Sequence, residues 1–338
     1  MPAPVGKTGP PRASVIITAY NNGDALGECL SALSRQSYRE KEIVIVLDTS
    51  SSDNTANVVE SFALSFPSCR VIKCEGVGRS QARNIGWRGC DSEIIMFADG
   101  DDTYEPEYLS RAVASLDSDE EAGGVCLGGT ALASGSPALQ RYYRAFGGTD
   151  ARFRQNSQSD PGWAWVYRRK CLEEVGGFDE TLAQAEDKDL CSRVKKAGYR
   201  IAYVGGVNWY HRKPGTYPRL IRKEVASGRR RVVFEAKRKD LSSLTKSLLP
   251  FAFLLLVLVA IPIAGLVYSL ALILLGTAGY LLASLSRHRS HSGSLVDALV
   301  SAPIALTARI AFSSGVVYGL IVLSLARSGI SHPDLGRF

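Results

Sequence analysis

The chain has 338 residues, enough for one catalytic domain and a further region, because single hydrophobic cores rarely grow beyond about 250–300 residues. Its hydrophobic residues, 46% of the total, crowd into the last hundred positions and predict a membrane portion there. The net charge is +7, and Lys and Arg concentrate at Arg219–Lys246, just before that portion. This position favours membrane lipids as the partner over nucleic acid, for which interleaved aromatic residues are not evident.

The first hundred residues alternate between short apolar runs and helical periodicity. This alternation predicts an α/β fold with a mostly parallel sheet covered on both faces. The expected order is strand Ser14–Ala19, helix Ala25–Arg35, strand Glu42–Leu47, a helix capped by Asp53, strand Arg70–Cys74, helix Ser80–Trp87 and strand Glu93–Ala98.

The next hundred residues are less regular. Gly128–Ser159 is rich in Gly, Ser, Arg and Gln and predicts a mobile loop or lid. Around it we expect a helix at Pro106–Leu116, a strand near Gly124–Leu127, helices at Arg169–Val175 and Glu186–Ala197, and a strand at Arg200–Val204.

The C-terminal region differs in kind. Leu248–Leu285 contains no charged residue and is too long for one helix across a hydrocarbon core of about 30 Å, so it predicts a hairpin of two spans. Leu295–Ala308 is amphipathic, and Ile310–Ala326 is a third apolar segment that either spans the membrane or lies in its interface. Basic residues on both sides of the hairpin place its ends in the cytoplasm.

The predicted organisation is a flexible N-terminus (1–13), a catalytic domain (14–217), a basic amphipathic juxtamembrane linker (218–246), a transmembrane hairpin (247–286), an amphipathic helix plus third apolar segment (294–327) and a tail (328–338). The seven cysteines are dispersed, odd in number and never spaced CxxC, which argues against a zinc site or disulfide framework. Met1–Arg12 lacks a secretion signal pattern. A multi-pass membrane protein with a cytoplasmic catalytic domain is therefore expected.

Three polar clusters follow predicted strands: Tyr20–Asn22, Asp48–Asp53 and Asp99–Asp102. The carboxyl ends of parallel strands share one edge, where ligands of such sheets bind. Asp99-x-Asp101 suits a diphosphate, because one carboxylate can hold a divalent ion that neutralises the phosphate oxygens. Taken alone, these residues also fit a solvated acidic turn.

The motifs together resemble the family-2 glycosyltransferases of the GT-A fold. The resemblance covers about Ser14–His211 and rests on Ser14–Asn22, Asp48–Thr55, Arg79–Gly86, Phe97–Asp102, Gly176–Glu180 and Glu186–Leu190. The apolar C-terminal region adds a membrane anchor to this enzyme. A non-processive type is expected, since the Gln-x-x-Arg-Trp motif of processive synthases is not visible and the chain reads Tyr217–Arg222 at that place.

From this resemblance the donor site follows. Asp48 would accept a hydrogen bond from the nucleotide base, Tyr20 and Asn22 would line the nucleotide pocket, and Asp99 would contact the ribose. Arg83 would stand near the base or the diphosphate. The implied donor-binding set is Ala19, Tyr20, Asn22, Asp48, Arg79, Arg83, Asp99 and Gly100.

The resemblance also implies a metal site. Asp101 would bind Mg2+ or Mn2+, and His211, expected just after the last strand, would be a further ligand or else an ordinary surface histidine. Arg79 either pairs with the donor phosphates, for which a guanidinium is suited, or is simply solvated.

On the acceptor side, Asp187 is the candidate catalytic base, because a sugar hydroxyl must lose a proton as it attacks the anomeric carbon. The alternative is that Glu186, Asp187 and Asp189 only favour the start of their helix through its dipole. Trp163 and Trp165, with Glu186, would bind the acceptor, although both tryptophans also suit core packing.

The predicted reaction is therefore inverting, metal-dependent transfer of a sugar from a nucleotide diphosphate sugar to a hydroxyl of a glycan or glycolipid at the cytoplasmic membrane face. Transfer to a polyprenyl phosphate is the alternative, although a phosphate oxygen needs no base. A non-catalytic sugar-nucleotide-binding membrane protein is the third possibility, against which Asp99-x-Asp101 and Asp187 argue.

Overall fold

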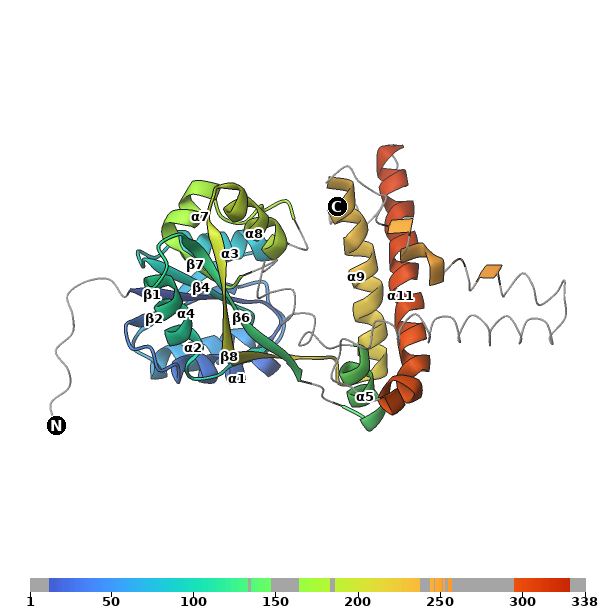
Figure 1. Ribbon diagram of the computed structural model, residues 1–338, viewed down its shortest axis with the longest axis horizontal. Coiled ribbons are helices and arrows are strands. Elements are labelled where there is room, and N and C mark those ends of the chain that lie inside the picture. Colours follow the sequence, from blue (N-terminus) through green and yellow to red (C-terminus); the bar gives the residue numbers. More distant parts are fainter. Residues whose placement is uncertain are drawn as a thin grey trace. The chain divides into compact units, whose positions relative to one another are not determined.

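The computed structural model describes residues 12–132, 135–146, 164–182, 186–237, 244–245, 247–250, 252, 255–256 and 295–328. The chain divides into two compact units (Figure 1). Unit 1 comprises Met1–Thr130 and Phe153–His211, and unit 2 comprises Ala131–Arg152 and Arg212–Phe338.

An eight-stranded sheet with the order β3-β2-β1-β4-β7-β6-β8-β5 forms the centre of unit 1. Its strands are β1 (Ala13–Ala19), β2 (Lys41–Asp48), β3 (Cys69–Cys74), β4 (Ile94–Ala98), β5 (Asp102–Tyr104), β6 (Ala122–Leu132), β7 (Val166–Arg168) and β8 (Arg200–Arg212).

The first four strands are parallel, and their register aligns their carboxyl ends. Ala19 lies opposite Leu47 of β2, and Ile17 lies opposite Ala98 of β4. The loops after β1, β2 and β4 therefore leave the sheet at one edge. Beyond β4 the sheet becomes mixed, with β7 antiparallel to β4 and β5 antiparallel to β8.

Each face of the sheet carries its own apolar core, because successive side chains of a strand point to opposite faces. Val15 and Ile17 of β1 pack on one side, and Ile16 packs on the other. The first core lies under α1 (Gly23–Ser34), α2 (Thr55–Ser65) and α4 (Tyr108–Asp117); the second lies under α3 (Arg79–Arg88), α7 (Arg169–Val175) and α8 (Glu186–Lys196). The predicted α/β fold with a mostly parallel sheet is confirmed.

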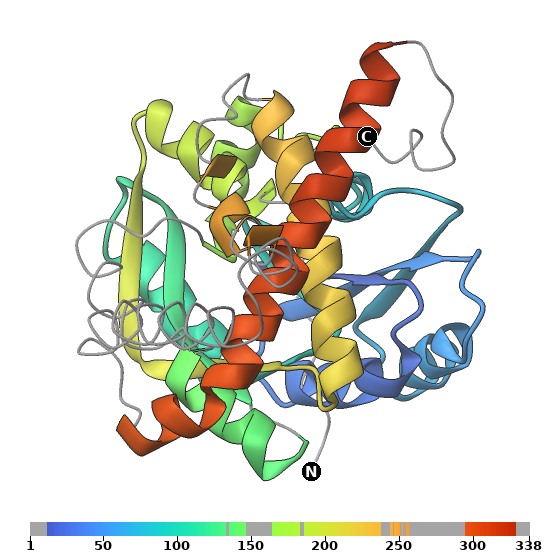
Figure 2. The same ribbon diagram turned by 90° about the vertical axis from the view of Figure 1, so that its right-hand side faces the viewer.

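Among the described residues, unit 2 contains the helices α5 (Pro137–Phe146), α9 (Tyr217–Lys237) and α11 (Leu295–Arg327), and α11 packs against both α5 and α9 (Figure 2). Glycines let α9 and α11 approach closely, since a Cβ on Gly228 would lie 1.9 Å from the Phe312 carbonyl oxygen and one on Gly315 would lie 2.0 Å from that of Val225. At the end where α5 packs, Leu139 and Tyr143 are buried with Leu220 and Ala308 from the two longer helices; these form the α5 cluster.

Two expectations are corrected here. Part of Gly128–Ser159, predicted as a mobile loop, forms the end of β6 and the helix α5. The amphipathic helix and third apolar segment, predicted over 294–327 as separate pieces, form the single helix α11, which contains Pro303.

The membrane prediction is met in part. Among the described residues, Pro303–Leu325 of α11 is long and apolar enough to cross a membrane. The predicted hairpin over 247–286 lies almost wholly outside the described residues.

Candidate functional site

Side chains tie together the loops that follow β1 and β2. Asn21 adopts the left-handed conformation, with φ of 46°, and its Oδ1 accepts a hydrogen bond from the Ser52 N–H at 2.8 Å. Asp53 Oδ2 accepts one from the Gly23 N–H at 3.1 Å. Asn and Asp suit these places because their short polar side chains bond to nearby backbone. Tyr20 is left 55% exposed at the rim of the sheet.

Asp48 ends β2 as a buried, ionised hydrogen-bond acceptor. Its Oδ1 accepts from the Ser50 hydroxyl at 2.6 Å and from the Gly76 N–H at 3.1 Å. Burial raises the pKa of Asp48, but the hydrogen bonds from Ser50, Gly76 and Val77 outweigh it and hold the pKa below its ordinary value. The loop after β2 therefore presents a fixed negative charge at the sheet edge.

The turn after β4 is built around Asp99 and Gly100. The Asp99 N–H donates to the Tyr104 hydroxyl at 3.2 Å, and the Asp99 carbonyl accepts from the Asp102 N–H at 3.1 Å. Gly100 is required by a close approach, since a Cβ there would lie 2.2 Å from Asn22 Nδ2. The turn and the loop after β1 thus touch through two of the predicted donor residues.

Asp101, Asp102 and His211 bring their ligand atoms within 4.8 Å of one another. The antiparallel pairing of β5 with β8 sets Asp102 opposite His211, and Asp102 Oδ1 lies 2.7 Å from His211 Nδ1. Burial, with the charges of Asp99 and Asp101, raises the pKa of Asp102 to about 7 against the lowering effect of its bond to His211. The group concentrates negative charge where a cation would be stabilised.

This cluster fits a divalent ion by its chemistry. It offers two carboxylates and one imidazole, a donor set that Mn2+ accepts, whereas Mg2+ prefers oxygen ligands alone. The Asp101 side chain is 49% exposed, so the group opens to solvent and to a ligand. The structure brings together the two predicted ligands, Asp101 and His211, and adds Asp102, which the sequence reasoning missed.

The position of His211 also differs from the expectation. The strand predicted to end at Val204 continues as β8 to Arg212, so His211 lies within the strand. The signal for Asp102 was present in the acidic run Asp99–Asp102, but its partner could be found only by pairing two strands about a hundred residues apart.

Arg83 is enclosed beneath this edge. Its Nη1 donates to Glu186 Oε1 at 2.8 Å and its Nη2 to Asp99 Oδ1 at 2.6 Å. The guanidinium carbon lies 5.4 Å from the ring centre of Trp165 and 5.2 Å from that of Phe178, and the side chain is 1% exposed. Arg83 was predicted near the donor base or diphosphate, but both of its terminal nitrogens are already bound to carboxylates.

Glu186 and Trp165, which were both predicted to bind the acceptor, are buried as well. Glu186 is 6% exposed and pairs with Arg83, and Trp165 is 9% exposed within the second core. Of the two readings left open for Trp165, the geometry favours core packing. Trp163 lies outside the described residues.

Asp187 and Arg79 remain accessible near this pair. Asp187 is half-buried at the first turn of α8, and burial followed by the charge of Glu186 raises its pKa above the ordinary value. A raised pKa makes a carboxylate a better proton acceptor. The Arg79 side chain is 60% exposed, with Nη1 3.7 Å from Glu186 Oε1, so it can reach a ligand in solvent.

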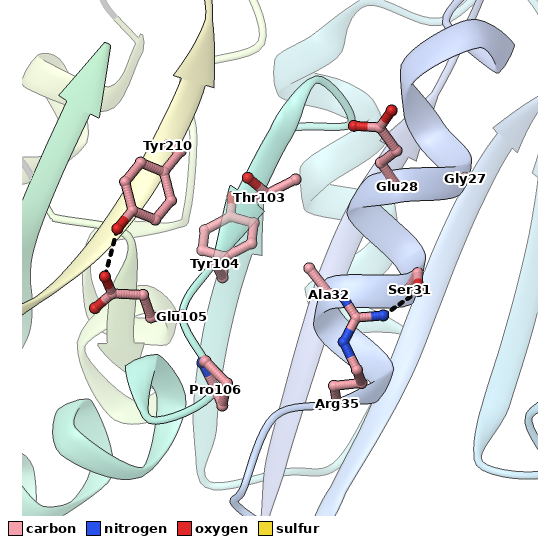
Figure 3. A pocket seen from close by; sticks show the side chains of 10 residues that line it. All are labelled: Gly27, Glu28, Ser31, Ala32, Arg35, Thr103, Tyr104, Glu105, Pro106 and Tyr210. Atoms are coloured by element: carbon pink, nitrogen blue, oxygen red, sulfur yellow. Dashed lines mark hydrogen bonds between the residues drawn. The ribbon is translucent and has the colours of Figure 1, made fainter. Parts of the chain in front are cut away.

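A separate pocket of about 660 Å³ lies between α1 and the β5–β8 ribbon (Figure 3). Thr103 and Tyr210, which face each other across the ribbon, line it together with Arg35 of α1. Asp102 and His211 form the adjacent pair of the ribbon and do not line the pocket. The pocket contains none of the predicted site residues.

Comparisons with known proteins bear on the family and the fold of the chain. Residues 14–176 match the family described as "Glycosyl transferase family 2". The "Probable glycosyltransferase YdaM" of Bacillus subtilis is 28% identical over 61% of this chain and 52% of its own length, so the chain spans about half of that relative. "Glycosyltransferase AglE" of Haloferax volcanii is 26% identical over 65% of this chain and 72% of its own. "O-antigen chain rhamnosyltransferase WbaN" of Salmonella anatum is 27% identical over 60% and 66%.

Among solved structures, a mannosyltransferase from Pyrobaculum calidifontis in complex with GDP-Man and Mn2+ aligns with a TM-score of 0.55 at 22% identity. The alignment covers 95% of this chain and 90% of the other, and it supports the GT-A-like fold of unit 1. By its motifs, its fold and the match over residues 14–176, this chain carries a glycosyl transferase family 2 domain.

Proposed function

We propose that this protein transfers a sugar from a nucleoside diphosphate sugar to a hydroxyl of a glycan or glycolipid, with inversion at the anomeric carbon and with Mn2+ or Mg2+ as cofactor. The observation that carries the proposal is the cluster of Asp101, Asp102 and His211, whose ligand atoms lie within 4.8 Å, on the sheet edge that also carries Asp48. The cation site suits the diphosphate end of a nucleoside diphosphate, and the buried Asp48 carboxylate on the same edge suits its base.

Each part of the donor has a corresponding group. Asp48, fixed and ionised, would accept from the nucleotide base, and the exposed Tyr20 ring would cover it. Asp99 would accept from the ribose hydroxyls, and the exposed Arg79 would pair with a phosphate. A divalent cation held by Asp101, Asp102 and His211 would neutralise the charge on the departing diphosphate.

Asp187 would take the proton from the attacking hydroxyl. Its half-buried position keeps it reachable, and its raised pKa suits a base. Attack from the Asp187 side, opposite the diphosphate, inverts the anomeric centre. A phosphate acceptor would not need this residue, so the proposed acceptor is a hydroxyl.

The acceptor would be met at a membrane. Pro303–Leu325 is long and apolar enough to span one, and α9 carries Lys and Arg that suit anionic headgroups. One relative is an O-antigen chain rhamnosyltransferase, which supports a cell-envelope glycan as the acceptor class. We place the catalytic domain on the cytoplasmic side.

A donor panel tests the proposal. Purified full-length protein is incubated with UDP-, GDP- and dTDP-sugars and Mn2+, and nucleotide release is measured with and without total lipid extract. We expect one donor to be turned over, faster with lipid, and EDTA to stop the reaction. Asp101→Ala should abolish turnover, whereas Glu60→Ala, on an exposed face of α2, should not.

The outcomes separate the alternatives. Turnover that depends on added polyprenyl phosphate and survives Asp187→Asn would replace the hydroxyl acceptor by a phosphate acceptor. Donor binding without any release would point to a non-catalytic sugar-nucleotide-binding protein. Full activity in EDTA would contradict the metal assignment.

A further inference from the structure

Arg83 joins the two halves of the candidate site. Asp99, to which Nη2 donates at 2.6 Å, belongs to the donor motif at the end of β4. Glu186, to which Nη1 donates at 2.8 Å, begins α8 and directly precedes Asp187. We infer that Arg83 is a positioning residue that couples donor binding at Asp99 to the acceptor-side helix through Glu186. The inference rests on the proposed function, in which Asp99 serves the donor and Asp187 the acceptor.

The surroundings of Arg83 exclude a direct role with the donor phosphates. Its side chain is 1% exposed, and the ring centres of Trp165 and Phe178 lie 5.4 Å and 5.2 Å from its guanidinium carbon. A phosphate would have to displace one carboxylate and enter a space filled by aromatic rings. Arg79, one helical turn earlier and 60% exposed, is the guanidinium that a diphosphate can reach.

Arg83 shares its single charge between two carboxylates. A buried guanidinium is stabilised only when its charge is paired, and either carboxylate alone can balance the single positive charge of Arg83. The charges of Asp99 and Glu186 both favour the charged form of Arg83 and hold its pKa above the ordinary value despite burial. Each carboxylate is therefore an anchor for the same cation, and a change at one is transmitted to the other.

The geometry shows how transmission would occur. The bond to Asp99 uses Oδ1 alone, because the guanidinium fork is divided between two carboxylates. Without the charge of Glu186, the fork can turn wholly to Asp99 and engage both of its oxygens, the bidentate arrangement that arginine and carboxylate prefer. Asp99 would then have less capacity to accept from a ribose. Lysine cannot replace Arg83, because an ammonium does not present a planar fork.

The test is the effect of an acceptor-side change on donor affinity. Affinity for UDP and for GDP, each with Mn2+, is measured by calorimetry for the wild type, Glu186→Gln, Arg83→Lys and the double variant. We expect Glu186→Gln and Arg83→Lys each to weaken binding of the nucleotide that the wild type prefers by about tenfold. The double variant should be no weaker than the worse single variant, because both act on one bridge.

Catalytic readouts separate positioning from simple stability. Nucleotide release by Glu186→Gln should show both a higher donor KM and a lower kcat, while its unfolding temperature stays near that of the wild type. Arg88→Lys is the matched control on α3, since Arg88 is exposed and bonds to the Gly176 carbonyl. Its nucleotide affinity and turnover should equal those of the wild type.

Three results would overturn the inference, and they are distinguishable. If the wild type binds a nucleotide and Glu186→Gln binds it with the same affinity, Arg83 does not couple the two sides. Additive losses of affinity in the double variant would show the same. A wild type that binds neither nucleotide and releases none from any donor would overturn the proposed function and the coupling with it.

Discussion

Replacing Gly100 by alanine tests how closely the turn after β4 approaches the loop after β1. The added Cβ would lie 2.2 Å from Asn22 Nδ2, so that nitrogen must retreat by about 0.8 Å to reach even 3.0 Å, a separation below which Cβ contacts essentially never occur. Leu26 Cδ1, at 3.3 Å, limits movement of the methyl group toward α1. Gly100 is not in the left-handed region, so the cost is steric.

The adjustment must come from the Asn22 side chain. Its backbone is held, because its N–H donates to Thr55 Oγ1 at 3.0 Å and its carbonyl accepts from the Leu26 N–H at 3.0 Å. Forcing a side chain about 30° from its rotamer costs about 0.5–1.5 kcal/mol. For a unit of this size each kcal/mol lowers the unfolding temperature by about 2–4 °C. Gly100→Ala should therefore fold, with a small loss of stability.

Nucleotide affinity should change more than stability. A displaced Asn22 would no longer line the nucleotide pocket, and we expect UDP or GDP binding with Mn2+ to weaken about tenfold, the effect of losing one good polar contact. Gly27→Ala is the control, because its Cβ meets only Val58 Cγ1 at 3.9 Å. It should raise stability by about 0.5–1 kcal/mol, as expected for alanine in a helix, and leave affinity unchanged. Wild-type affinity in Gly100→Ala would refute the role given to Asn22.

Four further predictions follow from the site and the helices. Asp102→Ala should weaken Mn2+ binding at least about tenfold, measured by electron paramagnetic resonance, because it removes one of three clustered ligands. Asp187→Asn should keep nucleotide affinity within about twofold and lower transfer by about 10²–10⁴-fold. Because burial and Glu186 raise the pKa of Asp187 above 3.8, wild-type transfer should fall with decreasing pH at a midpoint above that value, since only the ionised carboxylate accepts a proton. Gly315→Leu should lower the unfolding temperature, because the Val225 carbonyl lies 2.0 Å from the added Cβ; overpacking of this kind costs about 1–3 kcal/mol.

Each of these predictions has either a control variant or a result that would contradict it. Glu60→Ala should leave Mn2+ affinity unchanged, and Ser324→Leu, at an exposed position of α11, should leave the unfolding temperature unchanged. If Asp102→Ala binds Mn2+ with the affinity of the wild type, Asp102 is not a ligand of the metal ion. A transfer rate that does not fall as the pH is lowered toward 3.8 would argue against Asp187 as the base.

The local sequence pattern was sufficient to predict the strands of the parallel half of the sheet. The strands β1, β2 and β4 are largely apolar runs buried on both faces, and helical spacing identified the helices between them. The expected helix Arg169–Val175 coincides with α7. The polar clusters at strand ends needed only the rule that parallel carboxyl ends share an edge.

Features that depend on distant partners could not be predicted. β5 is only three residues long and begins with an acid, and it becomes a strand by pairing with β8. α5 carries Leu139 and Tyr143 one turn apart, but its apolar face has meaning only beside α9 and α11. The burial of Arg83 depends on carboxylates 16 and 103 residues away in the chain.

The division of the chain has a consequence for protein engineering. The polypeptide passes between the two units three times, because Ala131–Arg152 belongs to unit 2 although it is flanked by unit 1. Cutting the chain after His211 would leave α5 without the helices that bury Leu139 and Tyr143, exposing an apolar surface prone to aggregation. A soluble catalytic fragment should therefore also replace Ala131–Arg152 with a short polar loop. Transplanting unit 2 onto another enzyme would likewise need one insertion and one C-terminal fusion.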